Sequence, residues 1–183
     1  ILPSRMLWDK GIAEFVAAAR MVKKKVAARF VLAGHCDDAN PAVISQQQLS
    51  AWASEGVIEW WGERKDMPAV FRQANIVCLP SYREGLPRVL VEAAASGRAI
   101  VTTDTAGCRD VVHDGENGLL VPVKNATALA EALLKLIRIP QVRISMGQQG
   151  RQIVVQDYSL DTVLTQTLAT YQDLLSRLIL VNA

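Results

Sequence analysis

Short apolar runs alternate with helical patterns along most of this chain, and this alternation restricts the fold more than any other feature. Strand-like runs lie near residues 1–6, 29–33, 57–60, 76–79, 99–103 and 118–121. The segments between them repeat apolar residues at helical spacing, as in the face formed by Ile12, Phe15, Val16, Ala19 and Val22. Such an alternation is typical of a parallel sheet covered by helices on both faces. We therefore predict a doubly wound α/β domain of about six parallel strands.

Capping residues mark where several of the helices begin. Ser45, Asp66 and Asn125 each precede a helical pattern, and their side chains can accept from the unpaired N–H groups of a first turn. Two further helical stretches, near 141–155 and 160–180, close the chain without another strand. The sequence thus predicts one α/β domain over residues 1–183, with a helical tail.

Composition excludes several classes of protein. The chain has 183 residues, enough for one full domain, and its net charge of +2 does not suggest a nucleic-acid partner. Cys36, Cys78 and Cys108 lack metal-ligand spacing and favour a reducing compartment over a disulfide scaffold. No apolar run approaches the ~20 residues of a membrane span, and no signal peptide is visible. Because the chain enters a strand-like pattern without an initiator methionine, we expect a fragment of a longer protein.

Two glutamates, Glu84 and Glu92, follow the buried-strand pattern of residues 76–79. Pro87 suits the first turn of the next helix, and Gly97 suits its end, where a left-handed residue is needed. This places Glu84 in a strand-to-helix turn and Glu92 about two turns into the helix. In an open α/β sheet, such turns are where ligands bind.

The chemistry of this turn points to a sugar nucleotide. A helix N-terminus favours phosphate, whereas carboxylates favour hydroxyls, since each carboxylate accepts several hydrogen bonds. The alternative is that both glutamates are solvated surface residues, because their spacing alone is common. Glu92, however, lies among valine, leucine and alanine residues, where a lone charge would need a partner.

Three segments in order resemble one known family. Pro80–Gly97 is similar to the signature of the retaining GT-B glycosyltransferases of family 4, also called group 1. Ser4–Gly11 resembles the family's R-x4-K-G opening, and Asp114–Val121 resembles its later D-G-x-N-G-L-L-V segment. The resemblance covers nearly the whole chain. It implies the Rossmann-like donor half of a GT-B fold, without the N-terminal acceptor domain.

The resemblance also implies roles for particular residues. Glu84 matches the glutamate that binds hydroxyls of the donor sugar, and Glu92 matches the one that binds the nucleotide ribose. Arg5 and Lys10 match the basic pair on the diphosphate, where they would stabilise charge on the leaving nucleotide without a metal. Arg5, Lys10 and Glu84 are therefore the expected catalytic residues. The other expected substrate-binding residues are Gly85, Leu86, Arg88, Val89 and Trp61.

Some residues depart from this pattern or suggest another chemistry. Pro87 stands where many relatives have glycine, so the backbone contacts to phosphate rest on Arg88 and Val89. An acid–base role for His35 and His113 is rejected, because loop histidines without a motif are usually solvated. A metal at Asp37 and Asp38 is disfavoured relative to a turn or capping role.

The implied activity is transfer of a sugar from a UDP- or GDP-linked donor to an acceptor, with retention of configuration and without a cofactor. Synthesis of cell-surface polysaccharide or glycolipid is the expected setting, in the cytoplasm and with peripheral contact to the inner face of the membrane. The rivals are another GT-B enzyme, such as a sugar-nucleotide 2-epimerase or a phosphorylase, and a non-catalytic interaction module of the same fold.

The last predicted helix carries one apolar stripe. Two interpretations of it stay open, namely packing into the core and a half-exposed face toward the missing domain. The stripe consists of Leu164, Leu168, Tyr171, Leu174, Leu175 and Leu178.

Overall fold

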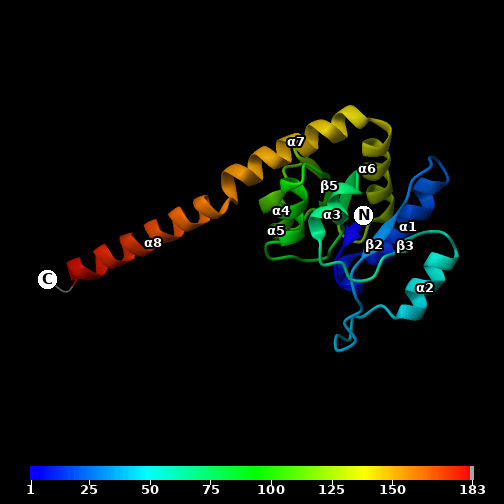
Figure 1. The fold of residues 1–183 in the computed structure, drawn as a ribbon, viewed down its shortest axis with the longest axis horizontal. Helices are drawn as coiled ribbons and strands as arrows, with labels where there is room; N and C mark the ends of the chain where they lie inside the picture. Colours follow the sequence, from blue (N-terminus) through cyan, green and yellow to red (C-terminus); the bar gives the residue numbers. More distant parts are fainter. Residues whose placement is uncertain (182–183) are drawn as a thin grey trace.

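Six short parallel strands alternate with helices in the computed structural model, as the sequence predicts (Figure 1). The structure describes the backbone of residues 1–181 and the side chains of residues 1–176. The strands are β1 (Leu2–Pro3), β2 (Val31–Ala33), β3 (Glu59–Trp60), β4 (Ile76–Leu79), β5 (Ala99–Thr103) and β6 (Gly118–Val121). All six lie at predicted positions, although β1 is shorter than the run at residues 1–6.

The strands form two three-stranded parallel sheets that meet at Ile1. One sheet has the order β1-β2-β3 and the other has the order β4-β5-β6. The Ile1 amine donates to the Ile76 carbonyl at 2.9 Å, and the Ile1 carbonyl accepts from the Cys78 N–H at 2.8 Å. The order across both sheets is therefore 3-2-1-4-5-6, the doubly wound order of dinucleotide-binding folds.

The helices begin where the capping residues predict. Ser45, Asp66 and Asn125 each accept a hydrogen bond from a backbone N–H three residues later. The helices are α1 (Ile12–Lys23), α2 (Gln46–Ser54), α3 (Met67–Arg72), α4 (Arg88–Ala95), α5 (Ala106–Val111), α6 (Ala126–Arg138), α7 (Pro140–Asp157) and α8 (Leu160–Val181), with a 3-10 turn, η1 (Trp8–Lys10).

Each face of the sheet is covered by its own core. On one face, α1 and α6 pack over buried residues such as Phe15, Leu32 and Leu133. On the other face, α4 and α5 pack over residues such as Leu90 and Ile100. The predicted apolar face of α1 is buried at all five positions. The doubly wound α/β prediction is confirmed.

Helix α4 ends as predicted at a left-handed glycine. Gly97 has φ 66°, its N–H donates to the Ala94 carbonyl, and the Arg98 N–H donates to the Ala93 carbonyl. This is the Schellman pattern of helix termination. It fixes the length of the helix that carries Glu92.

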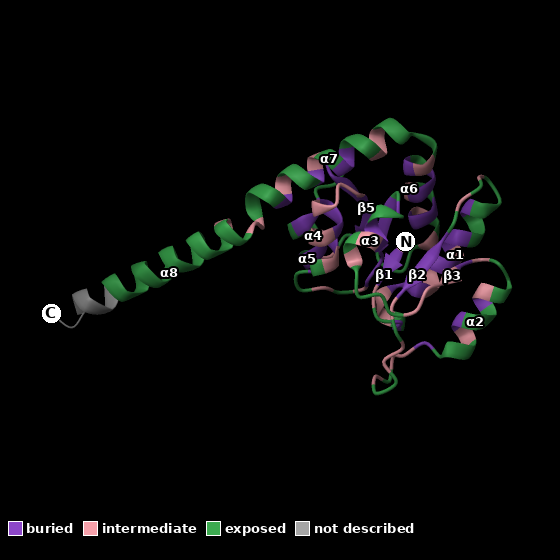
Figure 2. Ribbon diagram, viewed as in Figure 1, coloured by how far each residue is buried: buried purple, intermediate pink, exposed green. Residues whose placement is uncertain are grey.

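Helix α8 extends away from the α/β body as a long arm (Figures 1 and 2). Its large apolar side chains from Leu160 to Leu175 are 45% to 72% exposed, so the core-packing interpretation of the stripe is wrong. The side chain of Leu178 lies outside the described residues. Within residues 1–181, no helix is both long and apolar enough to cross a membrane.

Candidate functional site

The strand order places the segments after β1 and β4 at one edge of the sheet. β1 and β4 are neighbours, while the helices that follow them, α1 and α4, cover opposite faces. This is the topological switch point, and in open α/β sheets ligands bind there, outside the carboxyl ends of the strands. The segment after β1 carries Arg5 and Lys10, and the segment after β4 carries Glu84.

Lys10 and Glu84 form an ion pair at this switch point although 74 positions separate them. Lys10 Nζ donates to Glu84 Oε1 at 2.7 Å, and the side chains are 19% and 14% exposed. Gly11 makes this approach possible, because a Cβ at this position would overlap the Pro80 carbonyl oxygen. Its φ of 69° also suits glycine. The K-G dipeptide therefore packs η1 directly against the end of β4.

Two threonines of β5 fix the segment that leaves β4. Thr102 Oγ1 donates to the Leu79 carbonyl at 2.7 Å, and Thr103 Oγ1 donates to the Ser81 carbonyl. Both threonines are buried, so these bonds replace solvent at the strand end. Neither threonine is among the residues predicted for the site, although two adjacent threonines that end an apolar run are a usable signal in the sequence.

Gly107, in α5, supports the loop that carries Glu84. A Cβ on Gly107 would overlap the Gly85 carbonyl oxygen and crowd the Glu84 carbonyl oxygen. Only glycine allows the backbones to approach this closely. No pattern in the sequence distinguishes Gly107 from an ordinary helix glycine, so this residue was also missed.

The N-terminus of α4 presents open backbone donors. Within the described part of the chain, nothing accepts from the N–H groups of Arg88 and Val89. Pro87 lies at the N-cap and not in the first turn, which corrects the prediction. Its φ of −75° suits either position, but its ψ of 93° is extended, so the helix begins at Arg88. The preceding residue, Leu86, is 51% exposed.

Glu92 is not embedded in an apolar environment, contrary to the sequence-based prediction. Its side chain is 42% exposed, with Arg88 3.8 Å away across one helical turn. The helical period explains this, since Leu90, Ala93 and Ala94 turn into the core while Glu92 turns outward. An exposed pair of this kind is weak, which leaves the Glu92 carboxylate open to a ligand.

Arg5 lies at the same edge but pairs elsewhere. Its guanidinium donates to Asp37 Oδ2 at 2.7 Å, with Arg5 50% exposed. The Asp37 carbonyl accepts from the Asn40 N–H, as the predicted turn role requires. Among the described residues, no hydrogen bond or ion pair joins Arg5 to Lys10 or Glu84. The same part of the chain has no group of three acidic, histidine or cysteine residues arranged to hold a metal.

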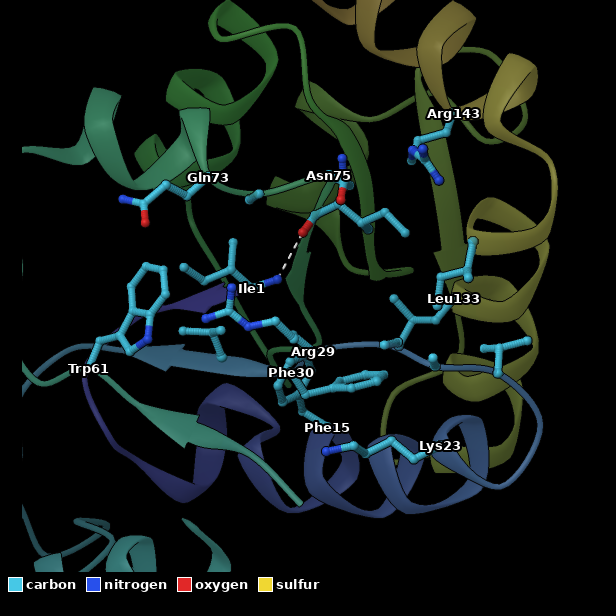
Figure 3. A pocket seen from close by; sticks show the side chains of 17 residues that line it. Ile1, Phe15, Lys23, Arg29, Phe30, Trp61, Gln73, Asn75, Leu133 and Arg143 are labelled. Atoms are coloured by element: carbon cyan, nitrogen blue, oxygen red, sulfur yellow. Dashed lines mark hydrogen bonds between the residues drawn. The ribbon is translucent and has the colours of Figure 1, made fainter. Parts of the chain in front are cut away.

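Trp61 follows β3, and its side chain lines a different cavity (Figure 3). Its indole N–H donates to Glu59 Oε2 at 3.2 Å, and its backbone N–H donates to the Leu32 carbonyl. The cavity, of about 670 Å³, lies where β1, β2 and β4 begin, and neither Lys10 nor Glu84 lines it. The structure therefore brings Lys10, Glu84 and the N-terminus of α4 together, and leaves the Trp61 ring apart.

The two histidines have separate carboxylate neighbours. His35 Nδ1 lies 3.8 Å from Glu63, and His113 Nδ1 lies 3.3 Å from Glu116. Each imidazole is about half exposed. This arrangement fits the solvated role that the sequence predicts for them.

Comparison with known proteins identifies the family. The model of the "Glycosyl transferases group 1" family matches residues 1–138, which is most of the chain. This chain belongs to the group 1 glycosyltransferases. The match includes Lys10, Glu84 and Glu92, so the candidate site lies within the group 1 domain.

Known relatives are considerably longer than this group 1 domain. The chain is 35% identical to N,N'-diacetylbacillosaminyl-diphospho-undecaprenol alpha-1,3-N-acetylgalactosaminyltransferase of Campylobacter jejuni, over 85% of this chain and 40% of the relative. Solved structures share the fold. Anabaena Alr3699/HepE in complex with UDP superposes with a TM-score of 0.84 at 23% identity, over 94% of this chain and 48% of that one. The chain thus spans less than half the length of either protein.

One solved structure has nearly the same extent. The C-terminal domain of the group 1 glycosyl transferase LpcC from Francisella tularensis superposes with a TM-score of 0.71 at 26% identity. The match covers 87% of this chain and 84% of that domain. The Rossmann-like half of a GT-B fold is therefore the correct description of the architecture.

Proposed function

We propose that residues 1–183 are the donor-binding domain of a retaining, family 4 glycosyltransferase that uses a nucleotide diphosphate sugar. The pairing of Lys10 with Glu84 at the switch point carries this proposal. Lys10 supplies an ammonium for phosphate, and Glu84 supplies a carboxylate for hydroxyls, 2.7 Å apart. In a sugar 1-phosphate, the phosphate is bonded to carbon 1 of the ring, and the neighbouring ring carbons carry hydroxyl groups. One such ligand therefore contacts both groups at once.

The surrounding groups extend the site along the nucleotide. The open N–H groups of Arg88 and Val89 bind phosphate at the positive end of α4, beside Gly85 and Leu86. Glu92, one turn further along the helix, accepts from the ribose hydroxyls. These contacts would hold the diphosphate between Lys10 and the helix N-terminus, with the sugar toward Glu84.

Charge stabilisation is the chemistry that this arrangement offers. When the sugar leaves, negative charge builds on the diphosphate, and fixed positive groups lower the barrier by stabilising it. Lys10 is preorganised for this role, whereas Arg5 must leave its exposed contact with Asp37. Exposed ion pairs contribute about 0–1 kcal/mol, so that exchange costs little. The proposed reaction needs neither a metal nor an organic cofactor.

The acceptor belongs to the rest of the protein. We place the acceptor site in an N-terminal domain that this chain lacks, with residues 141–183 as the helical tail of the donor domain. The name of the Campylobacter relative describes a lipid-linked acceptor. We therefore propose a role in cell-surface polysaccharide or glycolipid synthesis, at the cytoplasmic face of a membrane.

A panel of nucleotides tests this proposal directly. UDP, GDP and ADP, with UDP-glucose and UDP-N-acetylgalactosamine, are added to the chain and its thermal midpoint is measured. A ligand at 100 times its Kd stabilises by about 2.7 kcal/mol, which is a shift of about 5–11 °C for a domain of this size. UDP or GDP should give such a shift. No shift with any nucleotide at millimolar concentration would refute the proposal and favour a non-catalytic module.

Glu92→Gln tests the ribose contact in the same assay. It should weaken nucleotide binding without lowering the midpoint of the free domain, because the side chain is 42% exposed and packs little. Glu131→Gln is the matched control, since Glu131 is an exposed helical glutamate on α6. If Glu92→Gln bound UDP and GDP as the wild type does, Glu92 would have no part in the site.

A further inference from the structure

Tyr82 joins three segments around the Lys10–Glu84 pair. Its backbone N–H donates to the Asp9 carbonyl at 2.9 Å, one residue before Lys10. Its hydroxyl donates to Glu14 Oε1 on α1 at 2.9 Å. Lys124, in the turn between β6 and α6, places its ammonium 4.8 Å from the centre of the Tyr82 ring. Tyr82 therefore holds together the loops that follow β1, β4 and β6.

Lys124 makes its contact from an unfavourable backbone conformation. Its φ of 57° is the only positive value at a non-glycine position in the described part of the chain. Glycine adopts this conformation freely, and asparagine tolerates it, whereas a long side chain does not favour it. Residues held this way occur at sites where the side chain has a role. Here the side chain reaches an aromatic face, a favourable position for an ammonium.

The Tyr82 hydroxyl is the donor in its bond to Glu14, because a carboxylate oxygen accepts. Asp9 Oδ1 and Glu14 Oε2 are both buried, and nothing in the described residues bonds to either atom. Burial, followed by the hydrogen bond to Glu14, raises the pKa of Tyr82 to about 12. The hydroxyl thus stays protonated at physiological pH, and the hydrogen bond to Glu14 persists.

We propose that Tyr82, held by Glu14 and Lys124, is a positioning residue that sets the geometry of Glu84 relative to Lys10. Tyr82 lies two residues before Glu84 and bonds to the residue before Lys10, so it fixes both loops at their closest approach. Losing the contacts of Tyr82 should affect the two parts of the ligand differently, because in the proposed site Lys10 faces the phosphate and Glu84 faces the sugar. Loosening Tyr82 then weakens recognition of the sugar more than recognition of the nucleotide. This inference rests on the proposed donor site.

The first test compares two ligands, UDP and whichever of UDP-glucose and UDP-N-acetylgalactosamine binds the wild type more tightly. Tyr82→Phe removes the hydroxyl, and Lys124→Asn removes the ammonium while tolerating the positive φ. Each should raise the Kd of the UDP-sugar about threefold to tenfold relative to the Kd of UDP, as expected for one hydrogen bond or cation contact. Glu14→Ala should behave in the same way, and Glu14→Gln, which keeps an acceptor oxygen, should restore the ratio.

Tyr158→Phe is the matched control for the lost hydroxyl. The Tyr158 hydroxyl donates to the Asp110 carbonyl at 2.6 Å, and neither residue belongs to the proposed donor site. This variant should leave the ratio of the two Kd values unchanged. If Tyr82→Phe also left the ratio unchanged, Tyr82 would be only a structural residue and the inference would be overturned.

The second test needs no ligand and separates the two proposals. Amide hydrogen exchange in the free chain should quicken in residues 8–11 and 81–87 of Tyr82→Phe and Lys124→Asn, and stay unchanged in β5. If the wild type bound no nucleotide, the proposed function would fail, while local quickening would still support the positioning role. Exchange that is unchanged, or that quickens throughout the chain, would overturn the positioning role whatever the wild type binds.

Discussion

The strength of the Lys10–Glu84 pair can be measured with Lys10→Met, Glu84→Gln and the double variant. At 2.7 Å and an effective dielectric constant of about 20, the attraction between the charges is about 6 kcal/mol. The side chains are 19% and 14% exposed, so the loss of hydration cancels much of this attraction. We expect a net coupling of about 1–3 kcal/mol, with the double variant more stable than the sum of the single effects predicts.

Urea unfolding of the four proteins at 25 °C gives the coupling directly. Arg20 and Glu55 provide the control cycle, because their pair is equally short at 2.6 Å but is 45% and 49% exposed. That cycle should give less than about 1 kcal/mol and should weaken with added salt. A coupling for Lys10 and Glu84 no larger than the control would refute the claim that they form a preorganised, partly desolvated pair.

Three further perturbations test other parts of the structure. Gly107→Ala should destabilise the domain by about 1–3 kcal/mol in urea, since its methyl group meets the Gly85 carbonyl; unchanged stability would show that the loop yields freely. Ultraviolet titration of the wild type, with that of Tyr82→Phe subtracted, should show that the phenol of Tyr82 has a pKa of about 12, because burial and Glu14 disfavour the phenolate. A transition of this phenol near pH 10 would contradict the expectation. The pKa of Tyr82 is higher in the folded chain than in the unfolded chain. The part of the free energy of unfolding that comes from this difference is therefore complete below about pH 10, and it is lost as the pH rises toward 12. Leu168→Ser should change stability by less than about 0.5 kcal/mol, because the side chain is 58% exposed; a larger loss would mean that α8 packs on the body.

Local sequence patterns predicted the secondary structure well. Strands β4, β5 and β6 lie at the predicted residues, because their apolar runs are bounded by proline, glycine or polar residues. β1 proved shorter because the chain leaves the regular ladder after Pro3. Beyond Pro3, the Ser4 N–H donates to the Ala33 carbonyl of β2, and the Met6 N–H donates to the His35 carbonyl in the loop after β2.

The site depended on information that no local pattern contains. Lys10 and Glu84 meet at one edge of the sheet because of the strand order. Before the structure was known, only the family resemblance implied that these two residues belong to one site. Tyr82 and Lys124 were missed, since their contact joins two turns far apart in the sequence. The burial expected for Glu92 was wrong because neighbouring residues on a helix face different directions.

The arm formed by α8 affects how the molecule moves and scatters in solution. A compact domain of this length has a radius of gyration of about 16 Å. The 22 residues of α8 span about 33 Å, roughly twice that radius, outside the α/β body. The molecule therefore has an anisotropic shape, and its tumbling is slower about the axes perpendicular to the arm. Because α8 is long, a small rotation at the point where α7 meets α8 displaces the far end of α8 much more than it displaces the residues near that point.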